Sequence, residues 1–379
     1  MHYIDEVGDM SGQKVLLRLD LNTPVADGKV LDPFRLEKAI ETIDFLRSKN
    51  AQVIVVAHCE NSISQENNAE PSLLPMWQYL NGYFPIDFSP TYFTPEAIEK
   101  LLEMKDGGVL MFENIRINEG EKTNDSNFVK QLAAMADIYV NDAFSVCHRK
   151  HASIIGVPAV LPHYGGLLMK KEIEHISEAF NPERPFVFIL GGAKFDTKLP
   201  LITKYLDRAD YVFVGGALAN NFFRAQGYEI GRSLCADGNF GEKEMLQNSK
   251  LLLPVDVTVQ APDGSVSFKK PDEVIEGDLI VDSGPETIAQ LEASIRNARM
   301  VVWNGPLGNY EIGFADKTEM LAEAIAESGV RSVVGGGDTL ASIQKLGIEE
   351  KFSFISTGGG AMLDFLVNET LPGIEVLTR

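Results

Sequence analysis

The sequence predicts an α/β protein of two doubly wound, mainly parallel-sheet (Rossmann-like) domains joined by a linking helix. Its 379 residues are more than one ordinary domain needs. Short apolar runs rich in β-branched residues alternate with stretches of helical periodicity, which is typical of crossover units. Most of these runs are apolar on both faces, as in parallel strands that helices cover on each side.

The apolar runs mark the expected strands, and amphipathic segments between them mark the expected helices. Strands are predicted over residues 15–20, 53–57, 109–112, 138–141, 186–190, 211–214, 300–304, 331–334 and 352–356. Leu36, Ile40 and Ile43 recur at helical spacing in a helix predicted over 33–49. The same periodicity predicts a helix over 316–327.

The boundary between the two domains is expected between Ala152 and Pro185. Residues 157–166 are rich in proline and glycine, and 167–180 then form one amphipathic pattern. We therefore expect an N-terminal domain, an interdomain helix and a C-terminal domain, over residues 1–165, 166–180 and 181–361.

Composition excludes several classes of partner and site. The net charge of −20 disfavours nucleic acid and anionic membranes as partners. Cys59, Cys147 and Cys235 are far apart and odd in number, which argues against a disulfide framework or a zinc site and favours a cytoplasmic location. The first residues lack the pattern of a signal peptide, and no apolar run reaches the roughly 18 residues of a membrane span.

Polar or glycine residues follow nearly every predicted strand, at the edge where open α/β sheets bind ligands. The first half gathers basic residues that suit carboxylate and phosphate oxygens: Arg18, Arg35, Arg116, His148 and Arg149. A lone arginine is more often a solvated surface residue than a ligand. The number of arginines in an otherwise acidic chain favours an anionic ligand here.

The second half gathers glycines at strand-to-helix turns, which expose N–H groups to phosphate. Lys194 and Lys198 lie four residues apart, on one side of a helical turn, and Asp338 is a candidate Mg²⁺ ligand. Such glycines can equally mark tight packing. The Walker and protein-kinase motifs are absent. An anionic small molecule on one half and a Mg-nucleotide on the other together suggest phosphoryl transfer.

Several segments resemble phosphoglycerate kinases, in that family's order, across residues 13–375. They are VLLRLDLNTPVADGKVLDPFRLEKAIETIDFL, FENIRINEGEKTND, YVNDAFSVCHRKHAS, GGAKFDTK, GYEIGRSL, VVWNGPLGNYE, GGGDT and FISTGGGAM. The resemblance implies reversible phosphoryl transfer between 1,3-bisphosphoglycerate/ADP and 3-phosphoglycerate/ATP in glycolysis, with a carboxyl group as acceptor. It also implies a cytoplasmic monomer that uses ATP or ADP with Mg²⁺.

The resemblance also assigns roles to domains and residues. The N-terminal domain would bind 3-phosphoglycerate and receive the C-terminal tail, about 362–379, and the C-terminal domain would bind the nucleotide. The implied acid-binding residues are Asp20, Asn22, Arg35, His58, Arg116 and Arg149. The implied nucleotide-binding residues are Gly192, Lys198, Gly216, Asn304, Glu311, Gly336, Gly337, Asp338 and Thr339, with Glu311 at the ribose and Asp338 at the metal. The implied catalytic residues are Arg35, Lys194, Lys198, Gly358 and Gly359.

This assignment is consistent with the chemistry of the reaction. The acceptor carboxylate is already ionised at neutral pH, so no general base is needed, and no obvious one is found. Cationic side chains, Mg²⁺ and helix N-termini would offset the repulsion between the anions. Closure of the two domains around their ligands is expected.

Two departures from the family pattern leave alternatives open. The family usually reads His-Leu-Gly-Arg-Pro where this chain has His58-Cys59-Glu60-Asn61-Ser62, so an arginine is missing and an acid is added. Ile280 stands where glycine is usual near the adenine, which puts nucleotide choice in question. The alternatives are a kinase of the same fold with another acid as acceptor, and a catalytically silent nucleotide-binding protein.

Overall fold

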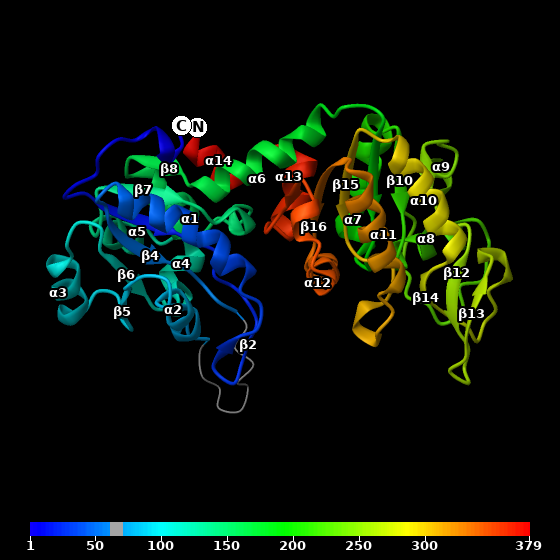
Figure 1. Ribbon diagram of the computed structural model, residues 1–379, viewed down its shortest axis with the longest axis horizontal. Coiled ribbons are helices and arrows are strands. Elements are labelled where there is room, and N and C mark those ends of the chain that lie inside the picture. Colours follow the sequence, from blue (N-terminus) through cyan, green and yellow to red (C-terminus); the bar gives the residue numbers. More distant parts are fainter. Residues whose placement is uncertain (61–70) are drawn as a thin grey trace. The chain divides into compact units, whose positions relative to one another are not determined.

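The computed structural model describes residues 1–60 and 71–379, which form two units (Figure 1). Unit 1 contains Met1–Glu174 and Thr370–Arg379, and unit 2 contains His175–Glu369. Helix α6 (Leu167–Ser177) spans the boundary between them. Among the described residues, no helix has both the length and the apolar character needed to cross a bilayer.

Unit 1 is built on a six-stranded parallel sheet. Its strands, in spatial order, are β5 (Asp87–Ser89), β6 (Val109–Phe112), β4 (Gln52–Val56), β1 (Lys14–Arg18), β7 (Ile138–Asn141) and β8 (His163–Gly165). Val15 and Leu17 of β1 pack into one apolar core, and Leu16 packs into a second core. Burial on both faces therefore explains the unbroken apolar run.

Helices supply the partners of both cores. Besides α6, the described part of unit 1 contains the helices α1 (Phe34–Ser48), α2 (Leu74–Leu80), α3 (Pro95–Glu103), α4 (Glu119–Thr123), α5 (Ser126–Ala133) and α14 (Pro372–Leu377). It also contains a small hairpin of β2 (Val25–Ala26) and β3 (Lys29–Val30). Leu36 and Ile43 of α1 join the core with Val15, whereas Phe128 and Leu132 of α5 join the core with Leu16.

Unit 2 repeats this plan. Its parallel strands, in spatial order, are β11 (Leu251–Leu252), β10 (Tyr211–Val214), β9 (Phe186–Leu190), β15 (Met300–Asn304), β16 (Arg331–Gly335) and β17 (Phe354–Ile355). Its helices are α7 (Phe195–Arg208), α8 (Ala217–Ala225), α9 (Glu242–Met245), α10 (Pro285–Asn297), α11 (Asp316–Ser328), α12 (Gly337–Leu346) and α13 (Gly360–Asn368). The prediction of mainly parallel, two-domain α/β architecture is confirmed.

The sequence did not predict the small antiparallel sheet of unit 2. It consists of β13 (Val266–Lys269), β12 (Val257–Gln260) and β14 (Leu279–Ser283). Val266 and Phe268 of β13 are exposed, so this strand lacks the two-sided apolar pattern on which the strand predictions rested.

The structure sets the domain limits differently from the sequence analysis. The helix expected over 166–180 is α6 followed by a 3₁₀ turn at Glu178–Phe180. The tail, expected from about residue 362, joins unit 1 only at Thr370. Before that point α13 packs on α7, where Lys204 of α7 donates to the Leu366 carbonyl and pairs with Glu369. The apolar face and carbonyl end of α13 thus keep it in unit 2.

Candidate active-site residues

Asp20, Asn22 and Arg35 form one group at the carboxyl edge of the unit 1 sheet. Asp20 and Asn22 follow β1, and Arg35 lies in the first turn of α1. Arg35 Nη1 lies 3.2 Å from Asp20 Oδ2 and donates to the Asn22 carbonyl at 2.7 Å. Ser145 donates to the same Asp20 oxygen at 2.5 Å. The buried Asp20 carboxylate therefore fixes the guanidinium at this edge.

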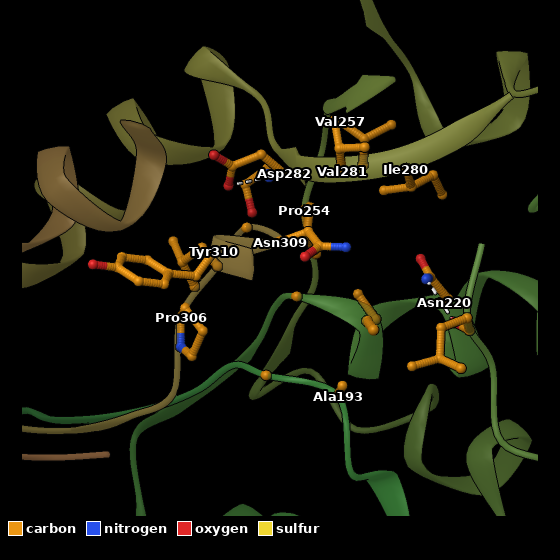
Figure 2. A pocket seen from close by; sticks show the side chains of 18 of the residues that line it. Ala193, Asn220, Pro254, Val257, Ile280, Val281, Asp282, Pro306, Asn309 and Tyr310 are labelled. Atoms are coloured by element: carbon orange, nitrogen blue, oxygen red, sulfur yellow. Dashed lines mark hydrogen bonds between the residues drawn. The ribbon is translucent and has the colours of Figure 1, made fainter. Parts of the chain in front are cut away.

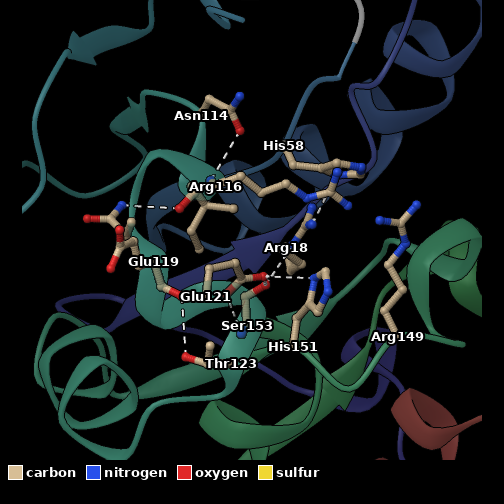
Figure 3. Close-up of polar contacts among 12 residues, drawn as sticks. Arg18, His58, Asn114, Arg116, Glu119, Glu121, Thr123, Arg149, His151 and Ser153 are labelled. Carbon is tan, nitrogen blue, oxygen red and sulfur yellow. Dashed lines mark hydrogen bonds and ion pairs between the residues drawn. The ribbon is translucent and has the colours of Figure 1, made fainter. Parts of the chain in front are cut away.

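His58 follows β4 and is almost fully buried beside Arg18 (Figure 3). Arg18 Nη2 lies 3.1 Å from His58 Nδ1. A guanidinium can only donate, so Nδ1 accepts and the imidazole proton lies on Nε2. Burial, followed by the charges of Arg18 and Arg116, lowers the pKa of His58 far below its usual value. His58 is thus a neutral donor through Nε2.

Arg18 is itself oriented by hydrogen bonds to buried residues. Its Nε donates to Ser153 Oγ at 2.9 Å, and that hydroxyl donates to the buried carboxylate of Glu121 at 2.6 Å (Figure 3). The sequence analysis grouped Arg18 with the basic residues that suit anionic oxygens. In the structure Arg18 is fully buried, and its guanidinium contacts Ser153 and His58, which lie 135 and 40 positions away in the sequence.

Arg116 and Arg149 share one carboxylate. Arg116 lies on a 3₁₀ turn, Ile115–Ile117, and Arg149 follows another, Phe144–Val146. Glu60 Oε1 pairs with Nη1 of Arg116 and lies 3.2 Å from Nη1 of Arg149. Among the described residues, buried Nε and Nη2 of Arg116 have no hydrogen-bond partner.

All six acid-binding candidates therefore lie at one edge of the unit 1 sheet. The Glu60 backbone N–H connects the two groups, because it donates to Asn22 Oδ1 at 2.9 Å. Asn61, where the sequence lacks the family's arginine, lies outside the described residues.

Unit 2 contains a pocket of about 240 Å³ at the carboxyl edge of its sheet (Figure 2). The sequence-predicted residues that line it are Gly192, Gly216, Glu311 and Asp338. Ile280 lines it too, so the residue singled out near the adenine does face this space.

The glycines of unit 2 fall into two physical classes. Gly216 has φ +60°, and a Cβ there would lie 2.7 Å from the Gly192 nitrogen. A Cβ on Gly191 would lie 2.1 Å from the Pro306 carbonyl oxygen. These positions need glycine for close backbone packing, whereas Gly337 and Gly359 would have no atom within 4 Å of a Cβ. The starts of α12 and α13 therefore have free space beside these glycines, where the first N–H groups of a helix lack intrahelical partners.

Gly336, Gly337, Asp338 and Thr339 form the start of α12. Gly336 precedes the helix with φ +109°, Asp338 is exposed in the first turn, and buried Thr339 accepts from the Gly305 N–H at 3.2 Å. Asn304 ends β15, and its carbonyl accepts from the Gly191 N–H at 3.0 Å. The ends of β9 and β15 therefore meet beside the first turn of α12.

Lys198 is buried within this turn. Its Nζ donates to the Gly191 carbonyl at 2.5 Å and lies 3.4 Å from the Asn304 carbonyl. Burial lowers the pKa of Lys198 to about 8, and the charge of Asp338 opposes that shift. Lys194, by contrast, is exposed at the start of α7.

Gly358 and Gly359 precede α13. The buried Gly358 N–H donates to Ser356 Oγ at 3.0 Å, and Gly359 has φ +51° directly before the helix. Of these two catalytic candidates, Gly359 has the more open backbone.

Sequence reasoning missed several polar residues of the pocket, among them Asn220 and Asp282. Asn220 donates to the Leu234 carbonyl at 2.8 Å, and its buried Oδ1 has no partner among the described residues. Burial raises the pKa of Asp282 to about 7. Neither residue belongs to a short motif; Asn220 lies on α8, one turn after the glycine pair.

Comparisons with known proteins lead to one family. A family model described as phosphoglycerate kinase matches residues 4–369. The chain is 40% identical to a phosphoglycerate kinase of Dictyoglomus turgidum over 97% of this chain and 96% of that protein. It is 39% identical to one of Caulobacter vibrioides over 98% of both chains.

Solved structures lead to the same family. The phosphoglycerate kinase of Coxiella burnetii superposes with a TM-score of 0.85 at 35% identity, over 99% of this chain and 98% of that one. That of Pyrococcus horikoshii gives 0.87 at 32% identity, over 100% and 98%. By sequence over nearly its full length and by fold, the chain belongs to the phosphoglycerate kinase family.

Proposed function

We propose that this chain transfers a phosphoryl group reversibly between 1,3-bisphosphoglycerate/ADP and 3-phosphoglycerate/ATP, with the acid bound on unit 1 and the nucleotide on unit 2. The observation that carries this proposal is the division of chemistry between the units. One sheet edge gathers arginines and a neutral histidine, and the other has a glycine-rich pocket beside Lys198 and Asp338.

The acid is proposed to bind through charged and neutral donors. Arg35, Arg116 and Arg149 would contact its phosphate and carboxylate oxygens, because a guanidinium fork matches both groups. His58 would donate from Nε2. Asp20 would hold Arg35 in place, and Asn22 would donate its side-chain amide to the acid.

The nucleotide is proposed to lie in the pocket of unit 2. Gly192 and Gly216 would flank the adenine, Glu311 would accept from the ribose hydroxyls, and Asn304 would contact the phosphates. The phosphates would lie at the start of α12, over Gly336, Gly337 and Thr339, where backbone N–H groups favour anions. Lys194, Lys198 and Gly358–Gly359 at the start of α13 would face the phosphoryl group in transfer.

Mg²⁺ is proposed to bind at Asp338. Within the described ranges, no cluster of three or more histidine, cysteine or acidic side chains could hold a metal alone. A single exposed carboxylate beside a phosphate site fits Mg²⁺, which usually takes one or two carboxylates together with nucleotide phosphates and water. Bound Mg²⁺ would offset phosphate charge.

The chemical step needs positioning more than proton transfer. The acceptor carboxylate is ionised at neutral pH, so the protein's cationic groups have to bring two anions together. Transfer between ligands bound to separate units would involve closure of the two units around them. A small-angle scattering profile that changes when both ligands are added is the expected sign of closure.

The decisive test is a coupled assay of Mg-ATP turnover with 3-phosphoglycerate. Wild-type turnover, and its loss in a Lys198→Ala variant, would support the proposal. Unchanged turnover in that variant would instead favour a reading in which this site is not catalytic. We also propose that the protein works as a cytoplasmic monomer without nucleic acid or membrane partners.

One observation favours the alternative of another acid as acceptor. Glu60 brings a carboxylate to Arg116 and Arg149, the arginines proposed for the substrate. Assays that compare 3-phosphoglycerate with other phosphorylated acids separate the two candidates, because the preferred acceptor would give the higher kcat/KM.

A further inference from the structure

Glu60 occupies two cationic groups of the proposed acid site. Its Oε1 pairs with Arg116 and lies 3.2 Å from Nη1 of Arg149. The side chain of Glu60 is 44% exposed, whereas that of Arg116 is only 7% exposed. The carboxylate therefore reaches the arginines from the solvent side, the side from which an anion would enter.

The main chain under this carboxylate is firmly anchored. The Glu60 N–H donates to Asn22, and Asn114 Nδ2 donates to the Cys59 carbonyl at 3.0 Å. The Cys59 N–H donates back to Asn114 Oδ1 at 3.4 Å. Glu60 is thus tethered beside the arginines, and rotation of its side chain alone can release them.

The charges around Glu60 keep it ionised and leave binding capacity unused. Burial alone would raise the pKa of Glu60, but the hydrogen bond and charge of Arg116, followed by those of Arg149, lower it. One carboxylate faces two guanidinium groups, and Nε and Nη2 of Arg116 have no partner in the part of the chain that is described. A second, more highly charged anion would therefore find attractive partners here.

We propose that Glu60 is a tethered competitor of the acid substrate, whose carboxylate occupies Arg116 and Arg149 until an incoming anionic group displaces it. The inference rests on the proposed binding of the acid at this edge. A singly charged internal carboxylate yields more readily to a dianionic phosphate than to a monoanion. Glu60 thereby lowers affinity for the acid and selects for phosphorylated substrates.

The test is calorimetric titration of wild type and Glu60→Gln with 3-phosphoglycerate and, separately, with inorganic sulfate. Glutamine keeps the shape and removes the charge. We expect about three- to tenfold tighter binding of both anions, as partly exposed ion pairs allow. The KM for the acid should fall by a similar factor, while the KM for ATP stays the same.

A matched control separates local competition from net charge. Glu41 pairs with Lys171 at 2.5 Å, and both side chains are about half exposed. Glu41→Gln changes the net charge equally without touching the arginines, so its affinities should equal those of wild type. Glu60→Ala serves as the second variant, and thermal unfolding verifies that each variant is folded.

Different results would overturn different claims. Unchanged or weaker anion binding in both folded Glu60 variants would overturn the inference, as would equal tightening in Glu41→Gln. If wild type bound no 3-phosphoglycerate, the proposed function would fail. The sulfate titrations would still decide whether Glu60 competes for the arginines.

Discussion

His58 illustrates how one buried neighbour determines the chemistry of a side chain. Because Arg18 occupies Nδ1, the ring has one tautomer and presents an N–H through Nε2. Burial, followed by the same cationic surroundings, lowers the pKa of the ring and keeps it neutral. A donor without charge can therefore stand among arginines at no cost in repulsion.

This role of His58 can be tested by substitution. His58→Phe fills the space without a donor and should weaken 3-phosphoglycerate binding about tenfold, as expected for a lost hydrogen bond to a charged group. His58→Gln keeps an N–H and should lose less. Calorimetry would measure both, and equal losses in the two variants would contradict a donor role.

Lys198 should couple nucleotide binding to a proton. Its pKa of about 8 lies below the ordinary 10.5 because of burial. Nearby phosphates would raise the pKa again, so Mg-ADP binding near pH 8 should take up protons, and affinity should fall as the pH rises above 8. Calorimetry in buffers of different ionisation enthalpy measures the uptake. Because methionine cannot titrate, Lys198→Met should show no proton uptake from this position.

The same shift has the opposite effect on folding. Burial penalises only the charged form of folded Lys198, so the penalty is present below about pH 8. Between pH 8 and the ordinary pKa the unfolded chain binds more protons, and this contribution to stability therefore rises with pH.

Among the elements, α12 and α13 begin where the phosphates are proposed to bind. Gly336 and Gly359 adopt positive φ directly before their helices, which turns the chain so that the first N–H groups remain open. Gly191 and Gly216 instead allow close backbone packing between neighbouring turns.

Gly359, directly before α13, and Gly360, its first residue, provide a matched pair for this element. Gly359→Ala should destabilise the protein by about 1–3 kcal/mol, because its φ of +51° strains any other residue although there is space for a Cβ. Gly360→Ala has equal space within the helix and should be neutral or slightly stabilising. Urea unfolding would measure both, and similar midpoints would refute the argument from φ.

In the whole molecule, each unit has its own sheet, its own apolar cores and its own set of candidate ligand-binding residues. The acid-binding candidates lie in unit 1 and the nucleotide-binding candidates in unit 2. We therefore expect each ligand to bind its own unit when the other ligand is absent.

Two variants test this division of labour. Arg35→Ala should weaken 3-phosphoglycerate binding by about ten- to a hundredfold, the effect of one lost charge-assisted contact, and leave Mg-ADP binding unchanged. Lys198→Met should weaken Mg-ADP binding and leave 3-phosphoglycerate binding unchanged. Separate calorimetric titrations measure all four affinities, and a variant that weakens both ligands equally would contradict independent sites.

Sequence alone predicts the fold class and the sheet edges that we propose as ligand sites. Strands buried on both faces leave unbroken apolar runs, and the residues that follow them mark the carboxyl edge of each sheet, so both signals are local. Predicted strands such as 109–112 and 186–190 match β6 and β9 residue for residue. The edge strands β5, β8 and β11, of two or three residues each, were not predicted, whereas the equally short β17 lies within the strand predicted over 352–356.

The contacts of those edge residues could be found only from the folded structure. Glu60 pairs with Arg116 and Arg149, which lie 56 and 89 positions further along the chain. Arg18 selects the tautomer of His58, which lies 40 positions away. The pKa of Lys198 likewise depends on its burial between two turns. Pairing and burial arise from distances in space, and charges that meet across long stretches of chain leave no periodic pattern in the sequence.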